Sequence, residues 1–402
     1  MSTGTKPLRL AFFRPALAHT TPIVGIPYQT GIPLSNGSTL REHLYAAALV
    51  GNNGNMIHRM AMIQMLEFDR ERSSQINLFR LMNSLGGPAK AADVLNTNFD
   101  GLVITMSNIL RVDATEPGMA ELVRALKIPV WCVGIGLQDS LPEGDHSPLK
   151  RDIVDLMHAL DEKAALFGVR GNQTLKWLKS VGIRRAQALG CPSMFAYPRN
   201  ILSISAPKNF KRIITAGHLS LTKNPNSKGT KLMAGLGDTR ASYVFQGEHA
   251  HFKDLLDTPH LYDEARQELD ASVLSEYIEK KCGITPPFNR YYSFGESSAW
   301  RQVCAQHDVY VGERIHGGVA AMQAGVPALV LHADVRVQEL TKFHGIPSCS
   351  LDEFAKNGWR AAVKKHLSVS GIDNFQARYQ EVLANFEAAM AHAGLTLKNR
   401  IQ

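Results

Sequence analysis

Short apolar runs alternate with amphipathic stretches along the first half of the chain. The runs LRLAFF, FDGLVIT, PVWCVG and FGVR have strand length and lie at residues 8–13, 99–105, 129–134 and 167–170. Stretches with helical periodicity separate them, and this alternation predicts a parallel sheet covered by helices. The predicted helices span residues 55–67, 116–126, 153–166 and 174–181.

The second half of the chain repeats the same pattern. Its apolar runs RIITA, SYVFQ, DVYVG and ALVLH lie at residues 212–216, 242–246, 308–312 and 328–332. Helical periodicity returns at residues 318–324 and in a long last stretch, 374–393, which could pack across both halves. Two segments without such periodicity, residues 14–50 and 217–240, are predicted to be a long loop and a mobile stretch.

A Pro-, Asn- and Ser-containing segment, YPRNILSISAPKNFK at residues 197–211, separates the two patterned halves. Such composition is typical of a linker, and 402 residues exceed the length of one ordinary domain. We therefore expect an α/β fold with two Rossmann-like domains, residues 1–200 and 201–402, whose parallel sheets face each other across a cleft. Ligands of such sheets bind at the carboxyl ends of the strands.

Composition indicates a soluble globular protein, with 45% hydrophobic and 20% charged residues. No apolar run approaches the roughly 18–20 residues that cross a bilayer, and the first residues lack the pattern of a secretory signal. The five cysteines stand apart, so neither a disulfide framework nor a zinc site is expected. We expect a cytoplasmic protein without a metal or another cofactor.

The formal net charge of +8 favours anionic partners. A phosphorylated small molecule and the anionic inner face of a membrane both fit this charge. Nucleic acid fits least, because long Lys/Arg runs interleaved with aromatic residues are missing. The sequence does not indicate an oligomeric state.

The segment VGERIHGGVAAMQAGVP, at residues 311–327, carries the sharpest chemistry. A strand ends there, and Gly317 and Gly318 open a helix, whose N-terminal N–H groups attract anions. Arg314 and His316 lie two residues apart, so an extended segment would place them on one face. A fixed cation beside a titratable imidazole suits anion binding with proton transfer. Two structural roles remain open as alternatives to anion binding. Arg314 could form an ion pair with a local carboxylate, and His316 could cap the helix.

Two further segments place an arginine directly after a strand. In GVRGNQT, Arg170 ends a strand, and Asn172 or Thr174 could cap the next helix. In DVRVQEL, Asp334 and Arg336 again lie two residues apart. Each pattern also fits a plain structural role, as a surface ion pair for Arg170 and as a helix cap beside a solvated arginine for the second pair.

Several common catalytic and nucleotide-binding motifs are missing. GIGLQ, at residues 134–138, lacks the full dinucleotide-binding spacing, so an NAD site is disfavoured. GNNGN, at residues 51–55, is too short for a phosphate-binding P-loop. The nucleophile elbow GxSxG is also absent.

Taken in order, GNNGN, GIGLQ, GVRGNQTLKWLKSVGI, GCPSMF and VGERIHGGVAAMQAGVPALVLHADVRVQEL resemble the polysaccharide pyruvyltransferase family. The resemblance runs from about residue 50 to residue 347 and is most specific from RIHG to AGVP. It implies a GT-B-like fold and transfer of pyruvate from phosphoenolpyruvate to a sugar as a ketal. The acceptor would be a polysaccharide or its lipid-linked precursor.

Residue by residue, the resemblance implies that Arg170, Arg314 and His316 contact phosphoenolpyruvate and carry the catalysis. We expect His316 to act as the acid that protonates the methylene carbon, and the general base to be Glu313, Asp334 or Glu339. The expected donor site comprises Arg170, Arg314, Ile315, His316, Gly317, Gly318 and Arg336. The expected acceptor site comprises Asn53, Asn55, Ser107, Asn108 and Gln138.

The chain departs from the family pattern at two of these segments. Ser107 and Asn108 stand where the family has a Gly-rich loop, and Gly171 replaces an acidic residue. Two other functions remain open for a chain with this architecture. One is a nucleotide-sugar glycosyltransferase, which would need a pocket for the base, and the other is a sugar- or anion-binding module without catalysis.

Overall fold

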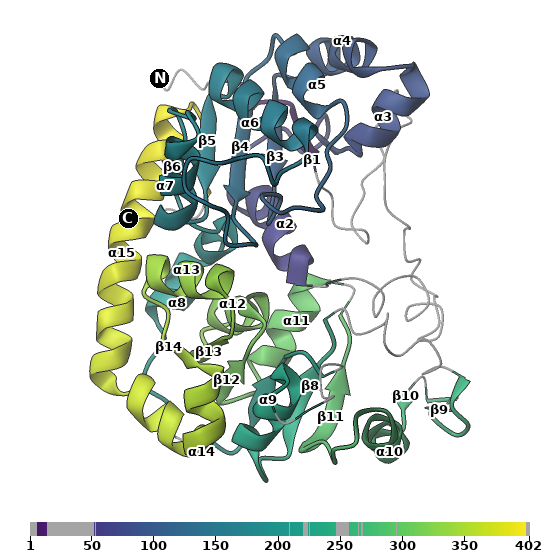
Figure 1. The fold of residues 1–402 in the computed structure, drawn as a ribbon, viewed down its shortest axis with the longest axis vertical. Coiled ribbons are helices and arrows are strands. Elements are labelled where there is room, and N and C mark those ends of the chain that lie inside the picture. Colours follow the sequence, from purple (N-terminus) through teal and green to yellow (C-terminus); the bar gives the residue numbers. More distant parts are fainter. Residues whose placement is uncertain are drawn as a thin grey trace.

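The computed structural model describes residues 6–13, 52, 54–208, 210–219, 224, 226–246, 257–263, 265–266, 268–294 and 296–398. The first half forms a six-stranded parallel sheet in the order β2-β1-β3-β4-β5-β6 (Figure 1). Its strands are β1 (Leu10–Phe13), β2 (Ser74–Gln75), β3 (Gly101–Thr105), β4 (Val130–Ile135), β5 (Leu166–Val169) and β6 (Gln187–Ala188).

The second half forms another six-stranded parallel sheet, in the order β11-β8-β7-β12-β13-β14. Its strands are β7 (Ile213–Thr215), β8 (Ala241–Val244), β11 (Phe288–Tyr292), β12 (Val309–Gly312), β13 (Ala328–His332) and β14 (Ser348–Ser350). If the strands of this half are counted from one in chain order, their order in the sheet is that of a Rossmann fold. The direction in which the strand order runs reverses between β7 and β12. The first sheet reverses between β1 and β3. These reversals are where α/β sheets bind ligands.

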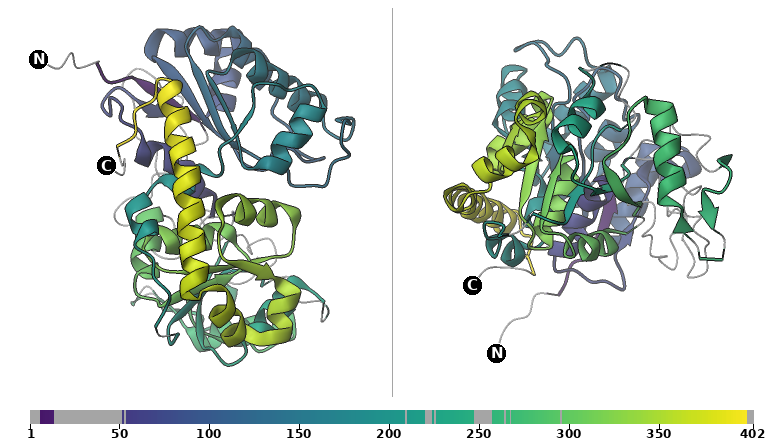
Figure 2. Two further views of the ribbon diagram at one scale, coloured as in Figure 1. Left: turned by 90° about the vertical axis from the view of Figure 1, so that its left-hand side faces the viewer. Right: turned by 90° about the horizontal axis from the view of Figure 1, so that it is seen from below.

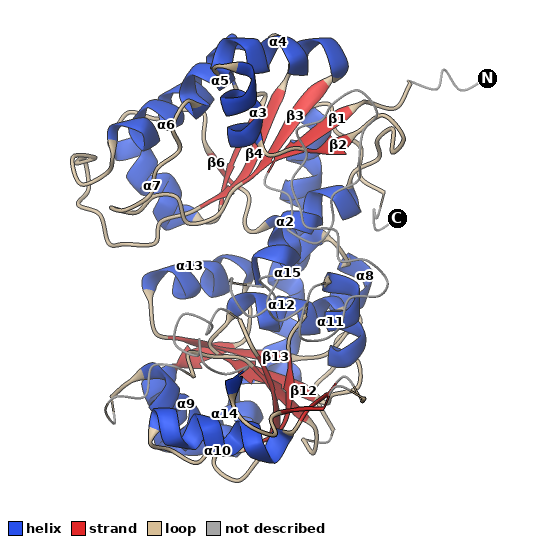
Figure 3. Cartoon of the chain, turned by 90° about the vertical axis from the view of Figure 1, so that its right-hand side faces the viewer, coloured by secondary structure: helices blue, strands red, loops and turns tan. Residues whose placement is uncertain are grey.

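Helices cover both faces of each sheet (Figure 3). The first half contributes α2 (Gly54–Met65), α3 (Leu78–Leu85), α4 (Pro88–Asn98), α5 (Met119–Ala125), α6 (Arg151–Lys163) and α7 (Asn172–Ser180). Two short helices, η2 (Pro192–Phe195) and α8 (Pro198–Leu202), connect the halves. The second half contributes α9 (Lys228–Leu236), α10 (Ala271–Cys282), α11 (Ser297–Cys304), α12 (Ile315–Gln323), α13 (Val335–His344), α14 (Leu351–His366) and α15 (Val369–His392), with a small antiparallel pair, β9 (Tyr262–Asp263) and β10 (Glu268–Leu269).

The predicted fold class, α/β with two Rossmann-like parallel sheets, is confirmed by these strand orders. Within the stretch predicted to be mobile, residues 217–240, residues 228–236 form α9, in which Leu232 and Leu236 are buried; the mobility itself stays a prediction. The long loop predicted at residues 14–50 lies outside the described residues. The division near residue 200 stays a prediction, since one hydrophobic cluster contains residues of both sheets, among them Val103 and Val330.

The last helix, α15, runs along one side of both halves (Figure 2). On its way it packs Phe386 on Phe195, with the ring centroids 4.2 Å apart, and the Tyr379 hydroxyl donates to the Met194 carbonyl at 2.7 Å. Beyond its end, the Ala393 carbonyl accepts a hydrogen bond from the Trp131 indole of β4 at 2.9 Å. The C-terminal segment therefore ties the second half to the first sheet. No helix in the described ranges is long and apolar enough to span a bilayer.

Replacing Phe386 by alanine should lower the free energy of unfolding by about 3–5 kcal/mol, because the substitution leaves a cavity between α15 and η2. The Phe386 side chain is 1% exposed, whereas Val369, at the start of the same helix, is 68% exposed. Val369→Ala is the matched control and should change stability by less than about 0.5 kcal/mol. Denaturant unfolding measures both, and equal effects would contradict the packing role of α15.

Candidate active site

A cavity of about 430 Å³ lies between the carboxyl ends of the two sheets. Loops after β3, β4 and β5 line it from the first half, together with α2, and the N-terminal turns of α12 and α13 line it from the second half. Its size is in the range of small-molecule sites. Its lining residues are Asn52, Asn55, Arg59, Phe79, Ser107, Asn108, Ile109, Arg111, Asp113, Ala114, Thr115, Glu116, Gln138, Arg170, His316 and Arg336.

Arg170 follows β5 and lies almost completely buried beside this cavity, with 1% of the residue exposed. Its Nε donates to the Gly134 carbonyl at 2.8 Å and its Nη1 to Asn108 Oδ1 at 2.5 Å, whereas Nη2 has no partner among the described residues. Burial lowers the pKa of the guanidinium, which nevertheless stays charged at neutral pH. A buried cation with an unused donor is a strong anion-binding group.

Two more arginines extend the positive charge of the cavity. Arg59 on α2 and Arg336 on α13 both line it, and burial lowers the pKa of each guanidinium. Within the described ranges Arg59 forms no ion pair, and Arg336 Nη2 lies 3.7 Å from Asp334 Oδ2. Arg111 also lines the cavity but pairs with Asp113 at 3.0 Å. The described lining of the cavity therefore carries more positive than negative charge.

Arg314 does not line the cavity, contrary to the sequence prediction. It occupies the N-cap position of α12, and its Nε donates to the Gly217 carbonyl at 3.0 Å. It also forms no ion pair with a carboxylate of the described part of the chain, so that alternative is wrong too. Its charge acts on the site indirectly, as one cause that lowers the pKa of Arg336. Ile315, likewise expected at the donor site, is a buried core residue.

The predicted anion-binding role of Gly317 and Gly318 is also wrong. Both N–H groups donate to the Arg314 carbonyl, at 2.9 and 3.3 Å, and are therefore used inside the helix. The structure explains the two glycines by packing instead. A Cβ at position 317 would lie 2.8 Å from the Tyr310 ring, and one at position 318 would lie 3.0 Å from Val330.

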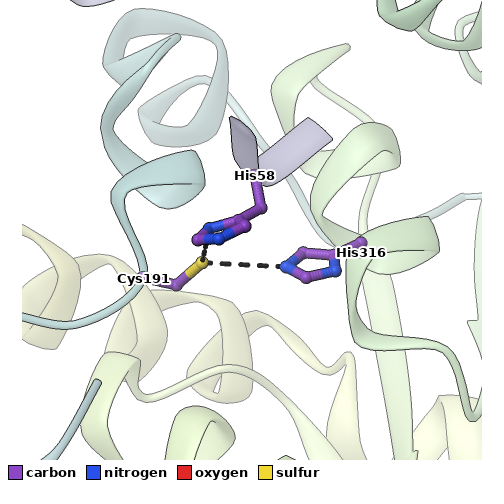
Figure 4. A group of neighbouring side chains, drawn as sticks. All are labelled: His58, Cys191 and His316. Atoms are coloured by element: carbon purple, nitrogen blue, oxygen red, sulfur yellow. Dashed lines mark hydrogen bonds between the residues drawn. The ribbon is translucent and has the colours of Figure 1, made fainter. Parts of the chain in front are cut away.

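His316 lines the cavity, as predicted, and lies beside two residues that the sequence did not indicate (Figure 4). Its Nε2 is 3.7 Å from Cys191 Sγ, and His58 Nδ1 lies 3.8 Å from the same sulfur. Burial, and then the charge of Arg170, lower the pKa of both imidazoles well below the usual value. Both rings are therefore neutral at pH 7 without a ligand. An anion in the cavity would raise the pKa of His316.

The residues expected at the acceptor side lie on the same cavity. Asn55, Ser107, Asn108 and Gln138 all line it, and Asn108 Nδ2 donates to Gln138 Oε1 at 3.3 Å. Asn108 also holds Arg170, so it belongs to the anion-binding end as well. Asn53 lies outside the described residues.

None of the three carboxylates considered as a general base lines the cavity. The Glu313 carboxylate lies 2.9 Å from His218 Nδ1, and Asp334 caps α13 by accepting from the Val337 N–H. Glu339 accepts from the Thr174 N–H at 2.6 Å and from its hydroxyl at 2.8 Å. Thr174 therefore joins α7 to α13 and does not cap α7.

His58, Arg59, Asp113, Glu116 and Cys191, which line the cavity or lie close to His316, were not singled out from the sequence. No local motif marks the first four, which reach the site only through the fold. Cys191 had one usable signal, because it begins the CPS of GCPSMF between two patterned segments. Asp113 and Glu116 are the carboxylates that line the cavity.

Comparison with known proteins identifies one family. A family model described as polysaccharide pyruvyl transferase matches residues 56–332, a stretch that contains both Arg170 and His316. None of the curated proteins matches the sequence.

Solved structures resemble this chain only weakly. UDP-GlcNAc 2-epimerase from Neisseria meningitidis has 13% sequence identity and a TM-score of 0.39, with 77% of this chain and 82% of that chain covered. Trehalose 6-phosphate synthase from Burkholderia multivorans has 11% identity and a TM-score of 0.44, with 96% and 86% covered. Similarity at this level of identity and TM-score does not indicate which reaction the chain catalyses.

Asn108→Asp should raise the stability of the ligand-free protein by about 1 kcal/mol, because a carboxylate would then face the buried guanidinium of Arg170. The same change should weaken anion binding, since it neutralises the group that attracts the anion. The melting temperature with and without inorganic phosphate measures both effects. Asn289→Asp on exposed β11 is the control, and an unchanged response of Asn108→Asp to phosphate would contradict the assignment of Arg170.

Proposed function

Because the chain belongs to the polysaccharide pyruvyl transferase family, and is therefore a transferase, we propose that it moves pyruvate from phosphoenolpyruvate to a saccharide. In this reaction two hydroxyl groups of the sugar form a ketal with the pyruvyl carbon, and phosphate is released. The observation that carries the proposal is the buried Arg170 guanidinium, whose Nη2 has no partner among the described residues and which lines the cavity.

Phosphoenolpyruvate fits the positive charge of this cavity. It carries a carboxylate and a phosphate, and planar guanidinium groups bind both kinds of anion through paired hydrogen bonds. Arg170, Arg336 and Arg59 supply three positive charges to the cavity. Of these, only Arg336 forms an ion pair with a described carboxylate, that of Asp334. We assign Arg170 and Arg336 to the donor, with Arg59 as an additional positive charge.

His316 is the proposed proton donor. Its Nε2 faces Cys191, so Nδ1 is the ring nitrogen left for a ligand in the cavity. The imidazole is neutral in the free protein, but a bound anion stabilises its protonated form. Binding of phosphoenolpyruvate would thus favour the protonated form of His316 that the proposed reaction needs.

The proposed reaction has three steps. Transfer of a proton from His316 to the methylene carbon leaves an oxocarbenium-like carbon that bears the phosphate and the carboxylate. A sugar hydroxyl adds to that carbon and releases its proton, and the C–O bond to phosphate breaks. The second hydroxyl then adds to the same carbon, releases its proton and closes the ketal.

The other polar residues of the cavity form the proposed acceptor site. Asp113, Glu116, Asn55, Ser107 and Gln138 line the cavity, and such carboxylate, hydroxyl and amide groups bind sugar hydroxyls. Because Glu313, Asp334 and Glu339 do not line the cavity, Asp113 and Glu116 become the proposed candidates for the base. The acceptor is a polysaccharide or its lipid-linked precursor, used at the cytoplasmic face of the membrane.

Millimolar phosphoenolpyruvate should raise the melting temperature, since a ligand at about 100 times its dissociation constant stabilises a protein by about 2.7 kcal/mol. Arg170→Met should abolish this response, because the apolar side chain removes the buried charge. Arg290→Ala on exposed β11 is the control and should respond like the wild type. A response to UDP- or CMP-sugars alone would contradict the proposal and favour a glycosyltransferase.

His316→Gln should lower the rate of pyruvyl transfer by about 10²–10⁴-fold, which is the usual contribution of general acid–base catalysis. The variant should keep its thermal response to phosphoenolpyruvate, because the arginines that bind the anion remain. Phosphate release in the presence of an acceptor measures the rate. Near wild-type turnover would refute the assignment of His316 as the acid.

A further inference from the structure

Three side chains with metal-binding atoms lie together, and one of them, His316, lines the cavity (Figure 4). His58 comes from α2, Cys191 from the turn before η2, and His316 from α12, and all three are buried. His58 Nδ1 and His316 Nε2 lie 3.8 and 3.7 Å from Cys191 Sγ. All three ligand atoms lie within 4.8 Å of one another. The sequence analysis expected no metal site, because these residues are far apart in the chain.

The distances suit a tetrahedral metal ion. With Zn–S bonds of about 2.3 Å and Zn–N bonds of about 2.0–2.1 Å, the sulfur and nitrogen ligands of a tetrahedral zinc lie about 3.6 Å apart. The two distances observed here are close to this value. A cation between the three atoms therefore requires only small movements of the side chains.

The side-chain chemistry also suits a metal. Metal ions bind the neutral imidazole, and one ring nitrogen of each histidine already faces the sulfur. The thiol proton of Cys191 would pass to solvent as the sulfur becomes a thiolate. Two imidazoles and a thiolate select zinc-like cations, whereas magnesium and calcium prefer oxygen ligands.

The ligands are held in place by their surroundings. The Cys191 N–H donates to His344 Nε2 at 3.0 Å, and Ser193 Oγ lies 3.0 Å from the sulfur. The His58 ring packs so closely on Gly134 that a Cβ there would lie 2.9 Å from its Cε1. Such support fixes the ligand atoms before a metal arrives.

We propose that His58, Cys191 and His316 form a binding site for a zinc-class divalent cation, with the fourth coordination position open to the cavity. His316 lines that cavity, and three protein ligands with one open position are typical of reactive zinc sites. Arg170 and Arg336 oppose a cation here, whereas the thiolate and an anion in the cavity favour it. The site would use Nε2 of His316, so a bound cation and the protonated His316 of the proposed reaction would exclude each other.

Cobalt(II) is a suitable probe, because a cobalt–thiolate bond absorbs in the near ultraviolet and tetrahedral cobalt absorbs in the visible range. The full chain, freed of metal by a chelator, should bind one equivalent of cobalt(II) and show both bands, and zinc should displace it. Cys191→Ser should lose the thiolate band. Failure of the folded wild type to bind a stoichiometric equivalent would overturn the proposal.

A second group of residues, Cys349, Glu353 and His366, supplies the matched control. There the Glu353 carboxylate already accepts from Lys365 Nζ at 2.7 Å and lies 3.5 Å from His366 Nε2. Cys349→Ser should therefore keep the thiolate band, and loss of the band in this variant would place the metal elsewhere and overturn the proposal.

His58→Gln provides a second test in case Cys191→Ser does not fold, with circular dichroism reporting the fold of each variant. It keeps the thiol but removes one nitrogen ligand, and should weaken cobalt binding at least about tenfold. Unchanged affinity would overturn the proposal. These titrations contain neither phosphoenolpyruvate nor a saccharide, so their outcome is separate from that of the proposed function.

Discussion

The burial of the Arg170 charge is the constraint on which this site depends. Removing a guanidinium from water is costly unless its donors are satisfied, and here Gly134 and Asn108 satisfy only part of them. Gly136 leaves room for the side chain, since a Cβ at that position would lie 2.8 Å from Arg170 Cδ. Within the described residues no carboxylate forms an ion pair with it. The protein thus keeps a buried positive charge beside a cavity, without an ion-pair partner among the described residues, and an anionic substrate would complete the site.

That cavity exists only because two sheets are held face to face. Arg170 belongs to the first half, and His316 and Arg336 belong to the second. Between the halves, the Glu339 carboxylate accepts both the N–H and the hydroxyl of Thr174, two short bonds in a buried setting. Gly171 is required beside them, because a Cβ there would lie 2.6 Å from Glu339 Cγ. Substitutions at this contact would act on the reaction through the distance between the two sets of charged groups.

The sequence predicted the parts of the molecule that local pattern determines. The strand-length apolar runs form strands in the structure. Arg170 and His316 both line the cavity because both come after strands of parallel sheets, whose carboxyl ends meet; their contact with the donor stays a prediction. Arg314 was misplaced, since a motif gives the position of a residue but not the direction of its side chain. Its side chain instead supports the Gly217 loop. The group of His58 and Cys191, 133 residues apart, arises from tertiary packing alone.

Crystallographic analysis of the protein with phosphoenolpyruvate bound tests the central claim most directly. The donor should lie in the cavity between the sheets, with an anionic group within hydrogen-bonding distance of Arg170 Nη2. Its methylene carbon should face His316. Density for the donor outside this cavity, or inside it without contact to Arg170, would contradict the account.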